Sequence, residues 1–277
     1  MENLFDLSGK VIIITGAAGL LGKKHAEVIA AYGGSPVLLD LSLKSIEEFA
    51  DQLNSKYGVN ASGYMVDITS EPQIENNLIK LVHKYGKIDG LINNAAINLD
   101  KPSEENKTKK NITRLENFAI ETWDKEIAVG ITGAFLCAKH YGYQISKNPN
   151  GGSVINISSD LGLISPDQRL YMKSGISDNQ QSVKPVTYSV VKTGLIGLTR
   201  YLATYWAEQN VRCNAICPGG VDNNLPADFM KNVVTKIPMG RLAKVNEYQS
   251  TLIWMLSDAS SYLNGAIIPI DGGRTAW

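Results

Sequence analysis

Tyr188 and Lys192 form a pair whose residue types and spacing could move a proton. They lie in a stretch with helical periodicity that runs through Gln209, and residues four apart on a helix share one face, about one turn apart. A phenol with a reference pKa near ~10 is a poor base at neutral pH, but an adjacent ammonium group favours the phenolate. A Tyr four residues before a Lys is common by chance and usually serves packing. The pair therefore indicates chemistry only if other motifs agree.

Seven short runs rich in β-branched residues predict the sheet that would position this pair. Most are separated by segments with helical periodicity, the pattern of a parallel sheet with right-handed crossovers. The runs are apolar on both faces, as in strands that helices cover on either side. They are 11–14, 37–39, 63–66, 88–92, 153–157, 211–216 and 266–270. We therefore expect one α/β domain with a doubly wound fold.

Three longer irregular stretches, 98–117, 161–185 and 219–244, each follow the end of a predicted strand. In open α/β sheets ligands bind outside the carboxyl ends of the strands, so we expect these stretches to cover a substrate. The lysine-rich piece 101–110 carries charges of both signs and is expected to be a solvated surface loop.

The first predicted strand runs into a glycine-rich turn, G-A-A-G-L-L-G over residues 16–22, and a helical segment follows. Glycines allow a sharp turn and bring backbone N–H groups against a pyrophosphate, whose charge suits the positive end of the helix dipole. Asp40 ends the second strand about 20 residues later, where ribose hydroxyls are bound. Its carboxylate would repel a 2′-phosphate, and the next residue is Leu41 rather than a basic one. The sequence thus favours NAD over NADP, with Lys44 as a more distant counter-argument.

Composition argues against nucleic-acid and membrane partners. The 27 basic residues balance 27 acidic ones, so no overall field attracts a polyanion. No apolar run approaches the ~20 residues of a membrane span, and the first residues lack a signal-peptide pattern. A small-molecule partner and a cytoplasmic location are expected. The three cysteines, Cys137, Cys213 and Cys217, have no further ligands nearby, so we expect buried small side chains and no metal.

Taken in order, these motifs resemble the short-chain dehydrogenase/reductase family from Lys10 to the C-terminus. The turn Asn93-Asn94-Ala95-Ala96 is similar to the family's N-N-A-G, and Asp271-Gly272-Gly273 to its terminal D-G-G. The resemblance implies a single Rossmann-type domain over 1–277 with a seven-stranded parallel sheet in the order 3-2-1-4-5-6-7. Its cofactor-binding part would cover about 8–100, and its catalytic and substrate-loop part about 101–277.

The resemblance also implies a set of cofactor-binding residues. Three of them depart from the family pattern: the central glycine of the turn stands one position early, Leu20 takes its usual place, and Ala96 replaces a glycine. The implied cofactor residues are Gly16, Gly19, Leu20, Leu21, Gly22, Asp40, Asp67, Ile68, Asn94, Ala95, Ala96, Tyr188, Lys192, Pro218, Gly219 and Val221.

Three catalytic residues follow from the resemblance: Ser159, Tyr188 and Lys192. Ser159 would orient the substrate oxygen, with Ser158 as its structural neighbour, Tyr188 would exchange the hydroxyl proton, and Lys192 would tune the phenol and hold the nicotinamide ribose. The gap between serine and tyrosine is longer than usual, which implies an insertion around 166–185. Tyr171 stands near the normal gap but lacks a lysine four residues later.

One departure concerns the family's fourth catalytic residue, an Asn that anchors a water in a proton relay. Its register carries Gly130, which has no side-chain amide. Either Gly130 opens space for an extra water, or another group anchors the relay, or activity is lost.

The leading hypothesis is therefore NAD-dependent interconversion of a secondary alcohol and a ketone. The G-A-A-G-L-L-G turn, the insertion and the segment Pro218–Asn223 also resemble dehydrogenases of flagellin-modification and nonulosonate clusters, which suggests a sugar or sugar phosphate as the substrate. Polar loop residues suit such a ligand: Asp160, Gln168, Arg169, Asn223 and Asn224. The alternatives are an NADPH-dependent carbonyl or 3-oxoacyl reductase and a catalytically impaired dinucleotide-binding protein.

Aromatic residues on the helices that this family uses for subunit pairing imply a homotetramer or homodimer, with a core role as the alternative. They are Phe135, Tyr141, Tyr143, Tyr201, Tyr205 and Trp206.

Overall fold

The computed structural model describes residues 3–97 and 111–277. Within them one parallel sheet of seven strands has the order β3-β2-β1-β4-β5-β6-β7, which confirms the predicted doubly wound Rossmann-type fold. The strands are β1 Val11–Thr15, β2 Ser35–Asp40, β3 Ser62–Met65, β4 Gly90–Asn93, β5 Gly152–Ile157, β6 Val211–Pro218 and β7 Ile267–Ile270. The order reverses between β1 and β4, the place where such sheets open a ligand crevice.

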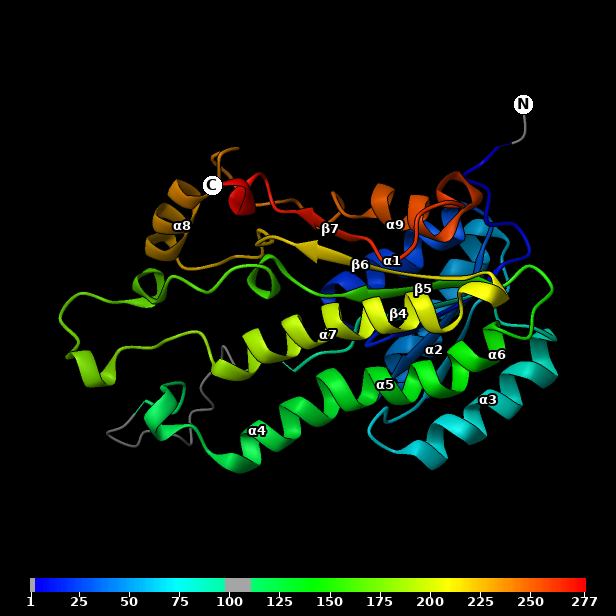
Figure 1. Ribbon diagram of the computed structural model, residues 1–277, viewed down its shortest axis with the longest axis horizontal. Helices are drawn as coiled ribbons and strands as arrows, with labels where there is room; N and C mark the ends of the chain where they lie inside the picture. Colours follow the sequence, from blue (N-terminus) through cyan, green and yellow to red (C-terminus); the bar gives the residue numbers. More distant parts are fainter. Residues whose placement is uncertain (1–2, 98–110) are drawn as a thin grey trace.

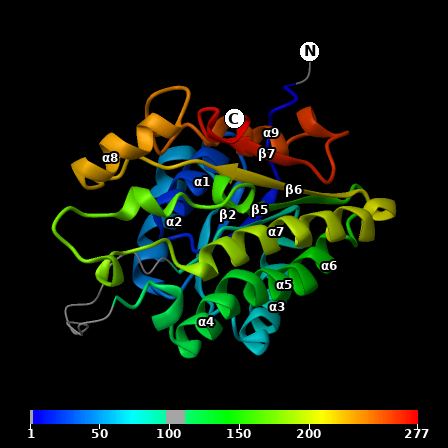
Figure 2. The same cartoon turned by 60° about the vertical axis from the view of Figure 1, so that its left-hand side comes forward.

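Helices cover both faces of the sheet (Figures 1 and 2). One layer contains α1 Leu20–Ala31, α2 Leu43–Tyr57 and α9 Gln249–Leu256; the other contains α3 Glu71–Tyr85, α4 Ile120–Ile127, α5 Gly133–Cys137, α6 Tyr143–Ile145 and α7 Val186–Tyr205. Side chains alternate along each strand, so Ile12 and Ile14 pack in the first layer's core and Ile13 packs in the second's. Both faces are thus apolar, as the sequence predicted.

Two segments differ in detail from the sequence-based expectation. The stretch 219–244 is not wholly irregular, because it contains the short helix α8, Ala227–Val233, which packs near the turn Gln168–Tyr171 of the stretch 161–185. The helix that precedes β5 is also not regular. Two π-helical turns, Ala128–Thr132 and Ala138–Gly142, interrupt it on either side of α5. Such turns often mark functional positions.

Cys137, Cys213 and Cys217 are free and buried, as predicted. None of the helices within 3–97 and 111–277 combines the length and the apolar character that a membrane crossing requires. The lysine-rich piece 101–110 lies outside the described residues.

Candidate active site

The glycine-rich turn between β1 and α1 is too tight for side chains at two positions. Gly16 has a φ of +64°, and a Cβ there would lie 2.8 Å from the Cα of Ala95. A Cβ on Gly22 would lie 2.3 Å from the carbonyl oxygen of Gly16. Gly19 precedes the first turn of α1, whose N–H groups have no partner within the helix. The turn therefore has the backbone that fits a dinucleotide pyrophosphate.

Asp40 is held beside this turn at the end of β2. Its Oδ2 accepts a hydrogen bond from the backbone N–H of Ala18 at 2.9 Å, and its Oδ1 accepts one from the N–H of Leu41 at 2.8 Å. The side chain of Leu41 is exposed. A negative group and an apolar side chain thus occupy the position that would meet the 2′ side of an adenosine ribose.

Asn94 joins the end of β4 to the glycine-rich turn. Its Nδ2 donates to the carbonyl oxygens of Thr15 at 2.9 Å and Gly16 at 3.1 Å, and the Thr15 hydroxyl accepts from its backbone N–H at 3.0 Å. Asn94 therefore fixes the geometry of the turn through its own side chain.

The other predicted cofactor residues lie at the carboxyl edge of the same sheet. Asp67 follows β3, and its Oδ1 accepts from the N–H of Thr69 at 2.9 Å. The backbone N–H of Gly219 donates to Ile270, at the end of β7, over 2.9 Å. The rest of the set is distributed as follows: Leu20 and Leu21 in the first turn of α1, Ile68 after β3, Ala95 and Ala96 after β4, Pro218 as the last residue of β6, and Val221 in a bridge to Ala243.

Tyr188 and Lys192 lie one turn apart near the start of α7. Lys192 Nζ is 5.8 Å from the centre of the Tyr188 ring and donates a hydrogen bond to the carbonyl oxygen of Ile157, the last residue of β5, at 2.8 Å. Burial, together with a smaller effect of the nearby ammonium of Lys184, lowers the pKa of Lys192 to about 8. The lysine is thus anchored to the sheet edge and releases its proton more readily than an exposed lysine.

Lys184 was not singled out from the sequence, and it brings a second cation to the same phenol. Its Nζ lies 4.0 Å from the centre of the Tyr188 ring, and its side chain is buried. The inserted segment holds it, because Gln168 Oε1 accepts from the Lys184 backbone N–H at 2.8 Å. Gln168 therefore shapes the insertion through its side-chain amide.

Ser158 and Ser159 both follow β5 and are buried, but they have different partners. The Ser158 hydroxyl donates to the backbone carbonyl of Lys192 at 2.6 Å, which is a structural contact. The Ser159 hydroxyl donates to Oδ1 of Asp160 at 2.8 Å, and Oδ2 of that carboxylate accepts from Arg274 at 2.9 Å. Asp160, which the sequence suggested as suited to a hydroxyl-rich ligand, therefore forms a buried ion pair with Arg274.

Gly130 lies against α7 with no room for a side chain. A Cβ there would lie 2.4 Å from Cγ1 of Val191. Gly130 lines a small cavity with Tyr188, Lys192 and a buried carboxylate, Glu126. Glu126 was also not identified from the sequence, although its position one helical turn before Gly130 could have indicated that it belongs to the site.

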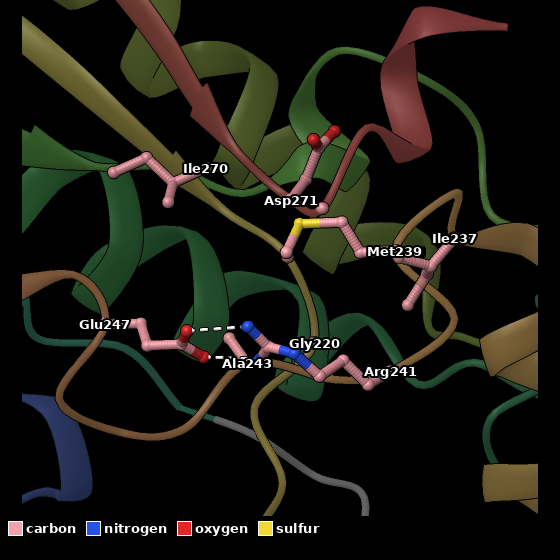
Figure 3. Close-up of a pocket in the computed structure, with 10 residues that line it drawn as sticks. Gly220, Ile237, Met239, Arg241, Ala243, Glu247, Ile270 and Asp271 are labelled. Carbon is pink, nitrogen blue, oxygen red and sulfur yellow. Dashed lines mark hydrogen bonds and ion pairs between the residues drawn. The ribbon is translucent and has the colours of Figure 1, made fainter.

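A second pocket lies at the carboxyl ends of β6 and β7 (Figure 3). Met239 and Ile237 from the stretch after β6 contribute apolar walls. Arg241 crosses its rim and forms a two-pronged ion pair with Glu247, with N–O distances of 2.6 and 2.7 Å. Hydrogen bonds from Arg241 lower the pKa of Glu247 to about 2. Arg241 and Glu247 therefore neutralise each other at the rim of the pocket, which also borders Gly219.

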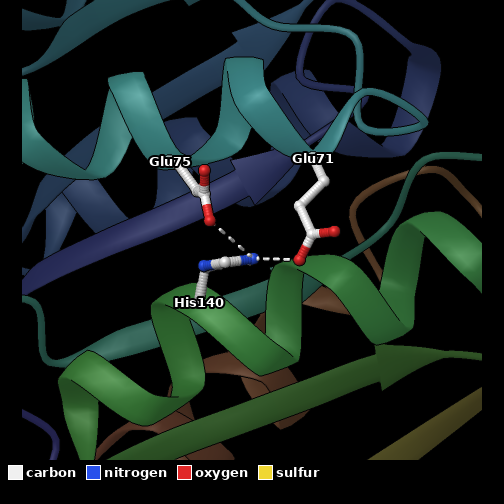
Figure 4. A group of neighbouring side chains, drawn as sticks. All are labelled: Glu71, Glu75 and His140. Atoms are coloured by element: carbon white, nitrogen blue, oxygen red, sulfur yellow. Dashed lines mark hydrogen bonds and ion pairs between the residues drawn. The ribbon is translucent and has the colours of Figure 1, made fainter.

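Glu71, Glu75 and His140 bring possible metal-ligand atoms together between α3 and the second π-helical turn (Figure 4). His140 Nε2 lies 2.7 Å from Oε1 of Glu71. The ammonium of Lys139 lies 2.6 Å from the same oxygen, and its hydrogen bond is the main cause that lowers the pKa of Glu71. Because a cation already neutralises this carboxylate, we interpret the group as an ion-pair cluster that joins two helices.

The fold and the site geometry define a Rossmann-type oxidoreductase, and comparison with known proteins gives its family. The model of the family described as enoyl-(acyl carrier protein) reductase matches residues 16–275. The chain belongs to the short-chain dehydrogenase/reductase family of oxidoreductases.

Relatives with different activities align over nearly the whole chain. It is similar to a 3-oxoacyl-[acyl-carrier-protein] reductase of Thermotoga maritima, with 31% identity over 96% of this chain and 98% of that protein. It is also similar to an NADP-dependent mannitol dehydrogenase of Alternaria alternata, with 31% identity over 99% of this chain and 95% of that protein. A short-chain type dehydrogenase/reductase from Mycobacterium marinum superposes with a TM-score of 0.82 at 26% identity, covering 99% and 98% of the two chains.

Proposed function

We propose that this protein is an NAD-dependent dehydrogenase/reductase that interconverts a secondary alcohol and a ketone. The observation that carries the proposal is the arrangement of Ser159, Tyr188 and Lys192 around the end of β5 and the start of α7, at the sheet edge that also bears the glycine-rich turn. A nicotinamide cofactor bound at that edge would supply the hydride acceptor or donor. The glycine-rich turn would bind its pyrophosphate, Asp40 an adenosine ribose hydroxyl, and Lys192 the nicotinamide ribose.

The roles of the catalytic residues follow from their surroundings. Tyr188 takes the substrate hydroxyl proton during oxidation and returns it during reduction. Two ammonium groups, of Lys184 and Lys192, lie within 6 Å of its ring centre and favour the phenolate. Ser159 turns its hydroxyl from Asp160 toward the substrate oxygen and stabilises the charge that develops there.

The cofactor preference rests on Asp40 and Leu41. A carboxylate fixed by two backbone N–H groups cannot swing away from a 2′-phosphate without losing both hydrogen bonds. The mannitol dehydrogenase relative uses NADP, so the preference must be measured directly. Quenching of the protein's fluorescence, or energy transfer from the protein to the bound cofactor, gives the Kd for NADH and the Kd for NADPH. We expect the Kd for NADH to be at least tenfold lower than the Kd for NADPH.

For the substrate we propose a hydroxyl-rich molecule such as a sugar, a sugar phosphate or a polyol. Relatives named as mannitol dehydrogenase and D-threitol dehydrogenase support this class. The test is turnover with NAD on a panel of polyols, aldonic acids and sugar phosphates, with an acetoacetyl thioester and NADPH as the competing arm. Tyr188→Phe should abolish turnover while leaving the Kd for NADH within threefold of the original. Normal turnover by this variant would remove Tyr188 from the mechanism.

We also propose that the protein pairs with copies of itself through the face formed by α5, α6 and α7. Phe135, Tyr143, Tyr201 and Tyr205 are exposed on these helices, and the rings of Tyr201 and Tyr205 stack with centres 5.5 Å apart. The other two aromatic residues of the predicted set, Tyr141 and Trp206, are buried in the core instead. Light scattering would give the oligomeric state, and Tyr201→Lys with Tyr205→Lys should lower it.

A further inference from the structure

Glu126 is a buried carboxylate beside the proposed catalytic pair, and none of the proposed catalytic roles involves it. It is the buried residue of α4, whose neighbours Glu121, Asp124 and Lys125 are exposed. Its Oε2 accepts a hydrogen bond from the hydroxyl of Thr187, the residue before Tyr188. One hydrogen bond does not offset the cost of burying a charge, which needs pairing as well, so the place of this carboxylate calls for a function.

The cavity beside Glu126 connects it with Lys192. Both residues line a space of about 20 Å³, together with Tyr188 and Gly130. A polar cavity of roughly 10–15 Å³ or more holds one water molecule. Among the described residues that line it, Glu126 is the one with a carboxylate. The cavity therefore has room for one water, and its lining includes both the residue that carries this carboxylate and the residue that carries the ammonium group.

The packing at Gly130 explains why the acceptor comes from one turn earlier. Val191 fills the space that a side chain at position 130 would need. No polar side chain can therefore reach the cavity from residue 130, whereas residue 126 lies one turn away on the same helical segment. Gly130 lies within the π-helical turn Ala128–Thr132 and is buried there.

We propose that the Glu126 carboxylate positions the water through which Lys192 exchanges protons with the surroundings during each catalytic cycle. This role rests on the proposed function. During oxidation the substrate proton reaches Tyr188 and Lys192 passes an ammonium proton to the cavity water. That water gives one of its own protons to a Glu126 oxygen, which returns it to solvent. Tyr188 then returns its added proton to Lys192, so both groups regain their starting protonation. No electrons move in these steps, and reduction runs them in reverse.

Glu126→Gln is the test variant, because the amide retains the volume and can still accept the Thr187 hydrogen bond. We expect kcat for a substrate from the polyol panel to fall by about 10- to 100-fold with KM within threefold, and the solvent deuterium isotope effect on kcat to increase. Thr187→Val removes the hydrogen bond and retains the carboxylate, and should keep most of kcat. Glu121→Gln, an exposed change on the same helix, is the matched control.

A second readout needs no substrate. The phenolate absorbance of Tyr188 is isolated by subtracting the titration of Tyr188→Phe, in protein without cofactor. Tyr188 also faces the ammonium groups of Lys184 and Lys192 and interacts with the phenol of Tyr248. The midpoint of this titration is the pH at which half of Tyr188 is phenolate. Removing the Glu126 charge should lower that midpoint by about one pH unit.

The two readouts separate this proposal from the proposed function. A shifted midpoint with no turnover on any panel member would contradict the dehydrogenase function and support the placement of Glu126. An unchanged midpoint, or a Glu126→Gln enzyme with the original kcat and isotope effect, would overturn the role of Glu126. Equal losses in Glu126→Gln and Thr187→Val would assign Glu126 to packing and overturn it as well.

Discussion

Arg274 donates a hydrogen bond to Oδ2 of Asp160 at 2.9 Å, and both side chains are almost fully buried. The other oxygen of Asp160 accepts from the hydroxyl of Ser159 and from the backbone N–H of Leu161, each at 2.8 Å. A residue that follows β7 therefore holds the loop that carries the proposed catalytic serine. The ion pair connects two segments that are 114 residues apart.

Arg274→Met should destabilise the protein and disturb Ser159. Removing one partner leaves the Asp160 charge buried and unpaired, which costs about 3–5 kcal/mol. Urea unfolding measures the free energy of unfolding. Arg274→Met combined with Asp160→Asn should recover part of that loss, because the uncompensated charge is gone. A single variant as stable as the original protein would show that the ion pair is not important for the fold.

We expect His25 to make the free energy of unfolding depend on pH. It is buried in α1 and neither ring nitrogen has a hydrogen-bond partner in the described structure; burial lowers its pKa from 6.5 to about 4. Between pH 6.5 and pH 4 the unfolded chain binds a proton that the folded protein does not. The free energy of unfolding should therefore fall as the pH decreases, by up to about 1.4 kcal/mol per pH unit from this group.

Urea titrations at pH 7 and pH 5 measure this slope. His25→Leu should make it shallower, while His83→Gln, an exposed change on α3, should leave it unchanged. If His25→Leu has the same slope as the original protein, another group is responsible for the pH dependence.

Gly22→Ala should impair cofactor binding, because its Cβ would lie 2.3 Å from the Gly16 carbonyl and 2.8 Å from the Cα of Ala17. The turn has to open to relieve the contact, so we expect the Kd for NADH to rise at least tenfold. Gly197→Ala on α7 is the control, because its Cβ meets no atom within 4 Å. The control should bind NADH normally and stabilise the helix by about 0.5–1 kcal/mol. Equal NADH affinities in the two variants would contradict the tight-turn argument.

The sheet could be predicted from local sequence patterns, but part of the candidate site could not. Alternation of short apolar runs with helical segments fixes the strands, and Tyr188 and Lys192 share a helix, so their proximity follows from spacing alone. The pair Asp160 and Arg274 depends on strands β5 and β7 ending at the same edge, which no local pattern reports. Lys184 reaches Tyr188 because of how the insertion folds, and Glu126 is buried against a helix that begins 60 residues later. Side-chain contacts between distant segments need the tertiary structure.

Asp40→Ala should reverse the discrimination between the two cofactors. The change removes the charge that repels a 2′-phosphate, so NADPH should bind more tightly, by about tenfold, or about 1.4 kcal/mol. It also removes the acceptor for the Ala18 N–H, so NADH should bind more weakly. The ratio of the two Kd values isolates the charge effect from this general loss. Asp40→Asn preserves the shape and an acceptor oxygen and should give an intermediate ratio. Adding Leu41→Arg to Asp40→Ala should favour NADPH further, because the side chain at position 41 is exposed. A ratio that does not change in any of these variants would mean that Asp40 does not meet the adenosine ribose.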